Sequence, residues 1–161
     1  MSEPLDIAPA DERELVLARL LDAPRSHVYR CWTEPGLITR WFTPPPWETV
    51  EAQTDPRVGG STLIVMRGPD GTEVSNRGVY LDVVPDERLV FTDAFVEPWV
   101  PSAKPFMTGI LTFEDAGRNR TRYVARVRHW SVEDARRHEA MGFHQGWGVT
   151  TDQLEALART L

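Results

Sequence analysis

The spacing of hydrophobic and polar positions divides this chain of 161 residues into three stretches. Residues 13–22 are rich in Leu and Val and end before a proline, which predicts a first strand. The next two segments carry apolar residues at helical spacing and are separated by Glu34-Pro35-Gly36, which predicts two short helices. From residue 47 to 130, turn residues recur about every ten positions, a pattern typical of an antiparallel meander.

The last predicted strand shows which of its faces is buried. Its side chains alternate between two faces, so residues of one parity lie together. Arginines occupy one parity and should face water, whereas the other parity is mostly apolar and ends in a histidine. The outward set is Arg122, Arg126 and Arg128, and the inward set is Tyr123, Ala125, Val127 and His129.

One long helix is predicted to follow and to reach the end of the chain. Residues 131–134 (SVED) form a capping box with Asp in place of the usual Glu or Gln, and the helix would have about 30 residues, or roughly 45 Å. Gly142, Gly146 and Gly148 lie inside it, and each should cost about 1 kcal/mol relative to alanine. They indicate either a helix shaped to leave room beside a sheet or a ligand, or close packing of backbone on backbone. The buried stripe comprises Ala140, Phe143, Trp147, Thr151, Leu154, Ala158 and Leu161.

These elements predict an α+β domain. Its antiparallel sheet of about seven strands would curl around the C-terminal helix, with the two short helices directly after the first strand. A chain of this length with 41% hydrophobic residues can bury one sizeable core. We therefore expect a single domain over residues 13–161. Residues 1–12 are acidic, contain proline and lack the basic and apolar regions of a signal peptide, so we expect a flexible tail.

The composition of the chain restricts the kinds of partner and location that we expect for this domain. A net charge of −6 and scattered arginines argue against nucleic acid as a partner. Cys31 is the one cysteine, which excludes an internal disulfide and favours a cytoplasmic location. No apolar run reaches the length of a membrane span. An exposed edge strand would allow a homodimer.

The chain contains no complete catalytic or metal-binding motif. His138-Glu139 resembles the start of the zinc-protease pattern HExxH, but Gly142 occupies the second ligand position and His144 lies six residues from His138. Gly59-Gly60 lacks the Gly-Lys-Ser/Thr of a phosphate loop. Cys31 beside Trp32 fits a small core residue better than a nucleophile. We predict no catalytic residue, no metal and no cofactor.

A set of aromatic, thioether and imidazole side chains is larger than the hairpins require. Each member can be ordinary core, but together they are consistent with a mostly apolar ligand pocket. His129 is either a ligand contact or proton shuttle, or a hydrogen-bonded residue at the rim of the core. Residues 96–105, with three prolines and Trp99, are expected to form a mobile loop at the pocket mouth. The predicted cavity is lined by Trp41, Met66, Tyr80, Phe91, Phe95, Phe106, Tyr123, His129, Phe143 and Trp147.

The order of several segments resembles one known superfamily. The segments that carry the resemblance are residues 22–42, Gly59-Gly60, residues 66–71 and 78–93, the LTFED segment at 111–115, and Gly146-Trp147 followed by Leu154 and Leu157. Over residues 14–161 the chain resembles the SRPBCC superfamily with its START-like helix-grip fold. Within it, the chain is similar to bacterial proteins related to the activator of heat-shock-protein-90 ATPase.

The resemblance implies a seven-stranded sheet gripping the C-terminal helix, with an elongated cavity between them. It implies three kinds of function, because a fold does not determine one. The first is binding of a small hydrophobic or amphipathic ligand. The second is interaction with a chaperone, and the third is an enzyme such as a cyclase, aromatase or hydrolase that would use His129 as acid or base.

Overall fold

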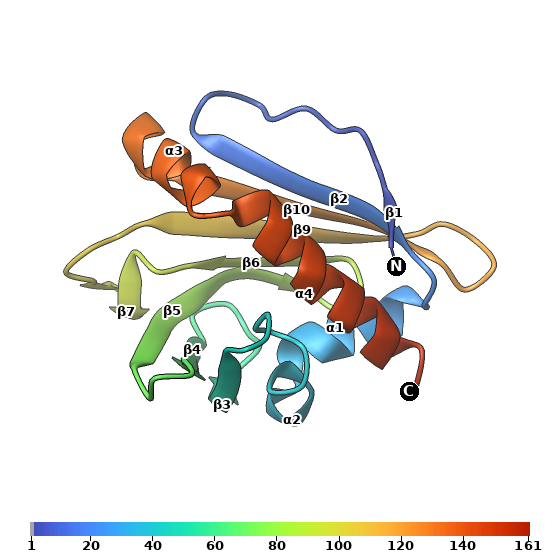
Figure 1. Ribbon diagram of the computed structural model, residues 1–161, viewed down its shortest axis with the longest axis horizontal. Helices are drawn as coiled ribbons and strands as arrows, with labels where there is room; N and C mark the ends of the chain where they lie inside the picture. The colour runs from blue at the N-terminus through green and yellow to red at the C-terminus, as the bar shows by residue number, and fades with distance from the viewer. Residues whose placement is uncertain (1) are drawn as a thin grey trace.

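The structure is a computed structural model that describes residues 2–161, and it has the expected α+β architecture (Figure 1). A curved antiparallel sheet forms one layer and the helices lie in its concave side. The helices are α1 (Arg25–Thr33), α2 (Pro35–Ile38), α3 (Val132–Ala140) and α4 (Phe143–Ala158). The strands are β1 (Glu3–Pro4), β2 (Glu14–Leu21), β3 (Glu48–Thr54), β4 (Ser61–Arg67), β5 (Glu73–Val84), β6 (Arg88–Thr92), β7 (Phe95–Glu97), β8 (Val100–Pro101), β9 (Met107–Asp115) and β10 (Thr121–His129).

The main sheet has eight strands in the order β1-β2-β10-β9-β6-β5-β4-β3. The meander predicted from the turns supplies its centre, since β3 to β6, β9 and β10 follow one another as antiparallel neighbours. The additional strand is β1, which pairs with β2 at the sheet edge. The Ser2 backbone N–H and hydroxyl also donate to Asp152 of α4, at 2.8 and 2.7 Å. The start of the segment that we expected to be a flexible tail is therefore bound to the domain.

The prediction of a single long C-terminal helix is wrong. The structure divides it into α3, which ends at Ala140, and α4, which begins at Phe143. Gly142 lies between them with φ of +97°, in the left-handed region that favours glycine. Gly142 therefore lets the chain change direction and does not weaken a helix interior. The predicted cap at Ser131 is present, because its hydroxyl accepts the Asp134 backbone N–H at 3.0 Å.

The core lies between β2, β9 and β10 on one side and α1 and α4 on the other. The parity predicted for β10 is confirmed: Tyr123, Ala125, Val127 and His129 are buried, and Arg122 and Arg128 are exposed. On the outer face, Arg126 and Arg128 bind the buried Glu14 carboxylate at 2.6 and 3.1 Å. The hydrogen bonds and these two guanidinium groups lower the pKa of Glu14 although burial acts to raise it.

The segment expected to be a mobile loop has regular structure. β7 and β8 pair in a short separate ribbon, and β7 also contacts β5. Trp99 lies at its turn with φ of +64° and is 88% exposed. The large apolar side chain of Trp99 is thus presented to solvent, on a ribbon that contacts β5 of the main sheet.

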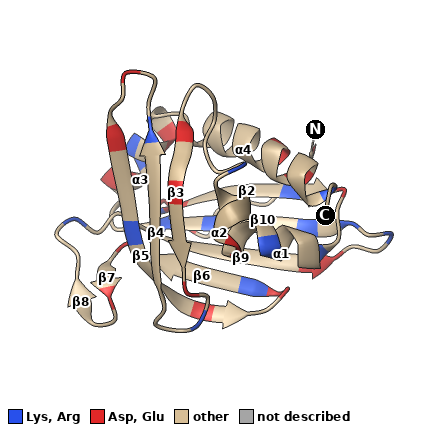
Figure 2. Cartoon of the chain, turned by 90° about the horizontal axis from the view of Figure 1, so that it is seen from below, with Lys and Arg blue, Asp and Glu red and all other residues tan. Residues whose placement is uncertain are grey.

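Lys and Arg are interspersed with Asp and Glu over the strands and helices (Figure 2). This mixture agrees with the scattered arginines of the sequence and offers no single basic stripe in that view. Among the described residues, no helix is both long enough and apolar enough to span a membrane.

Candidate functional site

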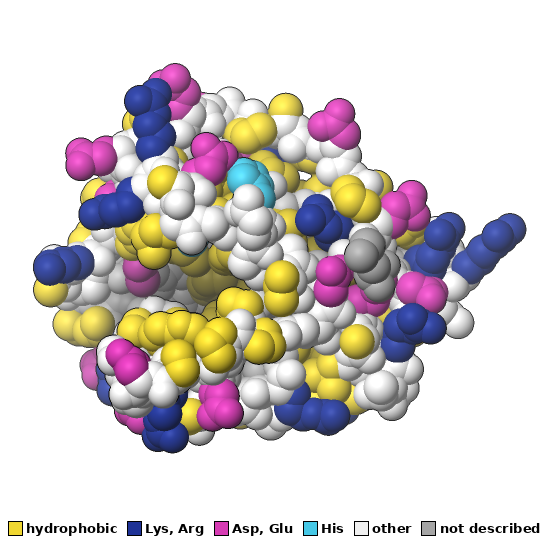
Figure 3. Space-filling model, viewed as in Figure 1, with side chains coloured by type: hydrophobic (Ala, Val, Ile, Leu, Met, Phe, Trp, Pro, Cys, Tyr) yellow, Lys and Arg dark blue, Asp and Glu magenta, His cyan; other side chains and the backbone are white. Residues whose placement is uncertain are grey.

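An apolar groove opens between the α3–α4 pair and the far half of the sheet. In the space-filling view, hydrophobic side chains line a hollow below the start of α4 and above the β4–β5 end of the sheet (Figure 3). The groove arises because the helices cover the sheet unevenly. α3 and α4 lie against β2 and β10, α1 lies against β9 and α2 against β3. By contrast, all seven residues of β4 are only partly buried or exposed.

The register of the sheet places the side chains that form the groove floor. Phe91 pairs with Gly109, which pairs with the inward-facing Val127. Tyr80 pairs with Phe91, and alternation along β5 and its pairing with β4 bring Ile64 and Met66 to the same face. These two side chains therefore extend the apolar face beyond the part that the helices cover.

Gly109 lets the Phe91 ring lie across the floor. A Cβ atom at Gly109 would approach the Phe91 ring to 2.5 Å, closer than real contacts allow. The ring also packs against Trp32 of α1, with centroids 5.8 Å apart. Phe91 thus joins the groove floor to the aromatic core.

The wall of the groove belongs to α4. Phe143 and Trp147, one turn apart, stack with ring centroids at 5.0 Å. Gly146 lies on the flank of α4 that carries Gln153, two turns later, whose amide donates to the Trp41 and Thr43 carbonyls. A Cβ atom at Gly146 would meet no atom of the described residues within 4 Å. This contradicts close backbone packing at Gly146 and leaves open space beside the groove side of the helix.

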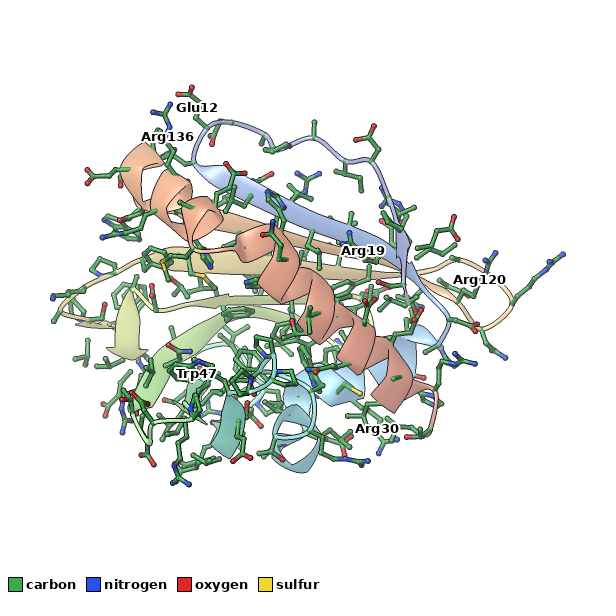
Figure 4. All side chains as sticks on the ribbon, in the orientation of Figure 1. Glu12, Arg19, Arg30, Trp47, Arg120 and Arg136 are labelled. Atoms are coloured by element: carbon green, nitrogen blue, oxygen red, sulfur yellow. The ribbon has the colours of Figure 1, made fainter. Side chains whose placement is uncertain are left out.

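The other glycine of α4 faces the opposite flank. A Cβ atom at Gly148 would lie 3.4 Å from the Arg19 guanidinium of β2. Figure 4 shows Arg19 behind α4 on its β2 side. The two glycines therefore do not share a role, because Gly148 accommodates an arginine whereas Gly146 borders empty space.

Two histidines form a polar pair at the α3 end of the groove. His129 is 4% exposed and its Nδ1 lies 2.9 Å from the Arg13 carbonyl oxygen. Its Nε2 lies 2.8 Å from Nδ1 of His138 on α3. Phe106 packs on both imidazoles, with centroids at 5.3 and 5.2 Å, and Phe143 packs on His138 at 5.0 Å. The pair is thus embedded in the same aromatic cluster as the groove wall.

The surroundings keep His138 uncharged. Burial, and secondarily the neighbouring His129, lower the pKa of His138 to about 4. The nearest charged side chains of α3 are paired with other groups: Arg137 with Asp134, and Glu139 with His144 of α4 at 2.9 Å. At neutral pH this end of the groove therefore presents a neutral imidazole.

The ten residues predicted to line the cavity separate into three groups. Trp41, Tyr80 and Tyr123 are buried in the closed core, where Trp41 donates to the Cys31 carbonyl and Trp32 donates to the Tyr123 hydroxyl. The structure gathers Phe106, His129, Phe143 and Trp147 at the groove. Phe91 and Met66 lie on the inner face of the sheet, and Phe95 lies on β7 against Trp99.

The sequence analysis missed His138, Ile64 and Gly109. His138 was considered only as a zinc ligand and was set aside because Gly142 occupies the second ligand position. Its contact with His129, nine residues earlier, corresponds to no sequence motif. Ile64 and Met66 alternate in β4, which is a signal for a shared face, but only the folded structure shows that the helices lie mainly against β2, β3, β9 and β10 and not against that face. Gly109 gave no signal because its partner, Phe91, is on a different strand.

The remaining candidate groups of the sequence analysis can also be placed in the structure. Burial raises the pKa of the Cys31 thiol to about 12, so at neutral pH it is not a thiolate nucleophile. Within residues 2–161, no group of three or more His, Cys, Asp or Glu side chains can hold a metal ion. Both ring nitrogens of His129 are engaged, which leaves neither available to a substrate.

Two further recesses open away from the groove. One, of about 440 Å³, is lined by Asp11, Arg13, Thr108, Ile110, Arg128, His129 and Trp130. The other, of about 220 Å³, is lined by Arg25, Val84, Glu87, Arg88, Thr112, Phe113 and Glu114. Their linings include charged side chains and residues from the outer face of β9, such as Ile110 and Thr112. They are poorer sites for an apolar ligand than the groove.

This geometry, a curved antiparallel sheet closed over a C-terminal helix, defines the helix-grip fold. Residues 22–159 match the family model described as Activator of Hsp90 ATPase homolog 1-like protein, and the chain belongs to that family. The resemblance that the sequence carried is thereby confirmed. No protein of curated function matches the sequence.

Solved structures agree with this assignment. A protein from Nitrosomonas europaea is 38% identical, with a TM-score of 0.88 over 92% of this chain and 96% of its own. A protein from Arthrobacter aurescens is 25% identical, with a TM-score of 0.76 over 94% and 90% of the two chains. An AHSA1-like protein from Aeromonas hydrophila, 17% identical, shares the fold with a TM-score of 0.70 over 91% and 92%.

Proposed function

We propose that this protein binds a small hydrophobic or amphipathic ligand in the groove between the sheet and α4. The observation that carries the proposal is the uncovered inner face of β4 and β5, where Ile64 and Met66 extend the apolar floor beyond the helices. Apolar side chains left partly exposed in one concave face are typical of a ligand site. The partly buried Trp147, which stacks on the buried Phe143, supplies an aromatic wall.

Gly146 supports the same function. A glycine in a helix interior costs about 1 kcal/mol relative to alanine, so its presence needs a compensating reason. The space beside it is empty, and its flank of α4 faces the segment that leads into β3. The absence of a side chain at this position keeps the groove open. The β7–β8 ribbon, with Phe95 against Trp99, adds apolar surface next to β5.

The test is a titration with the uncharged fluorescent probe N-phenyl-1-naphthylamine. The wild type should bind it with an enhanced, saturable emission. Gly146→Leu should raise the Kd by about tenfold or more, since the new side chain would occupy part of the groove. Gly146→Leu also replaces a helix-breaking residue with a good helix former, so the fold should survive.

Gln145→Leu is the matched control. It adds the same side chain to the same helix at an exposed neighbouring position and should leave the Kd unchanged. Equal affinities for all three proteins would contradict binding in the groove. A melting temperature that rises with probe concentration in the wild type would give independent support.

The family description favours a second candidate, action on an Hsp90-type chaperone. The check is the ATPase rate of a purified bacterial Hsp90 with and without an excess of this protein. A rate that stays constant up to saturating concentrations would argue against this function. A rate that rises would support it, and Gly146→Leu would then show whether the groove is involved.

A further inference from the structure

The hydrogen bonds of the histidine pair have a fixed direction. The Arg13 carbonyl oxygen can only accept, so Nδ1 of His129 carries a hydrogen and donates to it. In the neutral imidazole, Nε2 of His129 is then an acceptor. The hydrogen between the rings must therefore come from Nδ1 of His138. The chain of donors runs from His138 through His129 to the backbone of Arg13.

The direction of these hydrogen bonds leaves the lone pair on Nε2 of His138 without a donor. With its hydrogen on Nδ1, the neutral His138 has a bare Nε2, which can only accept. Among residues 2–161, Nε2 of His138 has no hydrogen-bond partner, and it is not among the buried polar atoms that lack one, so it is accessible. A hydrogen-bond acceptor is thus set in a cluster of Phe106, Phe143 and Trp147.

We propose that Nε2 of His138 accepts a hydrogen bond from a hydroxyl group of the bound ligand, so that the groove selects apolar molecules with an uncharged hydroxyl at one end. This inference rests on the proposed binding function and adds the chemical class of the ligand. His129 acts as a positioning residue, because its bond to the Arg13 carbonyl fixes the tautomer of His138.

The same arrangement disfavours carboxylates and other anions. A carboxylate has no hydrogen to donate, and it would meet the lone pair of a neutral ring. Making His138 a donor at Nε2 would require either a second proton or loss of the bond to His129. The guanidinium of Arg137 is paired with Asp134, and the Glu139 carboxylate with His144, so the charged neighbours on α3 are already engaged.

Three isosteric probes test the proposal: 2-naphthol, 2-methylnaphthalene and 2-naphthoate. Their Kd values are measured with the wild type, His138→Asn and His144→Asn. Asparagine at position 138 can still donate to His129 but lacks an acceptor at the Nε2 position. His144 is an exposed histidine on α4 that pairs with Glu139, which makes it the matched control.

The ratio of the Kd for 2-methylnaphthalene to that for 2-naphthol carries the information, since it cancels the apolar contribution shared by the two probes. We expect His138→Asn to lower this ratio by about three- to tenfold, the value of one hydrogen bond, and His144→Asn to leave it unchanged. We also expect 2-naphthoate to bind the wild type most weakly.

Each of the following results would overturn the inference. One is a ratio that is the same in the wild type and in His138→Asn, provided that thermal unfolding shows both to be folded. The other is tighter binding of 2-naphthoate than of 2-naphthol to the wild type. If none of the three probes binds the wild type, the proposed binding function itself fails, and the inference fails with it. Binding of all three without discrimination would overturn the inference alone.

Discussion

The two halves of the sheet are built from similar strands but have different surroundings. In the covered half, β2, β9 and β10 supply most of the buried core, and Leu111 is completely inaccessible. In the open half, β4 contains Thr62 followed by four apolar residues at positions 63–66, yet none of these side chains is fully buried. The same hydrophobic pattern thus fills a closed core in one half and leaves partly exposed apolar side chains in the other.

The difference comes from the course of the C-terminal segment. Gly142 redirects the chain after α3, so that α4 lies against β2 and α1 and does not reach across β4 and β5. The segment before β2 also contacts both helices: Ser2 donates to Asp152 of α4, and the exposed Arg136 of α3 lies 3.9 Å from Glu12 (Figure 4). The groove is the part of the concave face that remains.

The largest expected difference between the halves is the cost of removing an aliphatic side chain. Leu111→Ala should lower the free energy of unfolding by about 2–5 kcal/mol, because it leaves a cavity in a closed core. Ile64→Ala should cost about 1 kcal/mol or less, since that side chain is already partly exposed. Urea unfolding followed by circular dichroism measures both, and equal losses would show that the open half is packed as tightly as the covered half.

A smaller effect concerns the glycines at the boundary between the halves. Gly109→Ala should destabilise the fold by about 1–3 kcal/mol, because the added methyl group would collide with the Phe91 ring. Gly146→Ala should instead stabilise it by about 0.5–1 kcal/mol, since the methyl group enters open space and favours the helix. Melting temperatures of the two variants should move in opposite directions. A loss of stability in Gly146→Ala would mean that the space beside α4 is filled.

A third effect is a dependence of the free energy of unfolding on pH at the histidine pair. The unfolded chain binds a proton at His138 near its ordinary pKa of 6.5, whereas the native protein does so only near 4. The native state therefore binds fewer protons in this window, and the free energy of unfolding should fall as the pH decreases from about 6.5 to about 4.

His138→Phe keeps a ring in the aromatic cluster but does not titrate, so its loss of stability over the same window should be smaller. His144→Phe serves as the control and should follow the wild type. The lowered pKa of Glu14 also removes stability on acidification, but it does so equally in all three proteins and cancels in the comparison. Parallel curves for wild type and His138→Phe would contradict the neutral state assigned to His138.

The local part of this fold was predictable from the sequence, and the tertiary part was not. The strand expected at residues 13–22 is Glu14–Leu21, and the inward parity of β10 is as its alternation predicted, because both depend on neighbouring residues. Gly142 was counted as a cost to a helix, since sequence alone does not reveal a positive φ. The pairing of β1 and the contact between His129 and His138 depend on segments that the fold brings together. No local sequence pattern therefore predicts them.

Methyl NMR tests the central claim most directly, because the isoleucines report on opposite faces of the sheet. Ile64 and the methionines Met66 and Met107 lie on the inner face, whereas Ile110 lies on the outer face and lines the larger recess. Carbon-13-labelled isoleucine and methionine methyl groups are followed while 2-naphthol is added. Groove binding predicts saturable shifts at Ile64, Met66 and Met107 with Ile110 unchanged. Shifts at Ile110 with Ile64 and Met66 unmoved would contradict it.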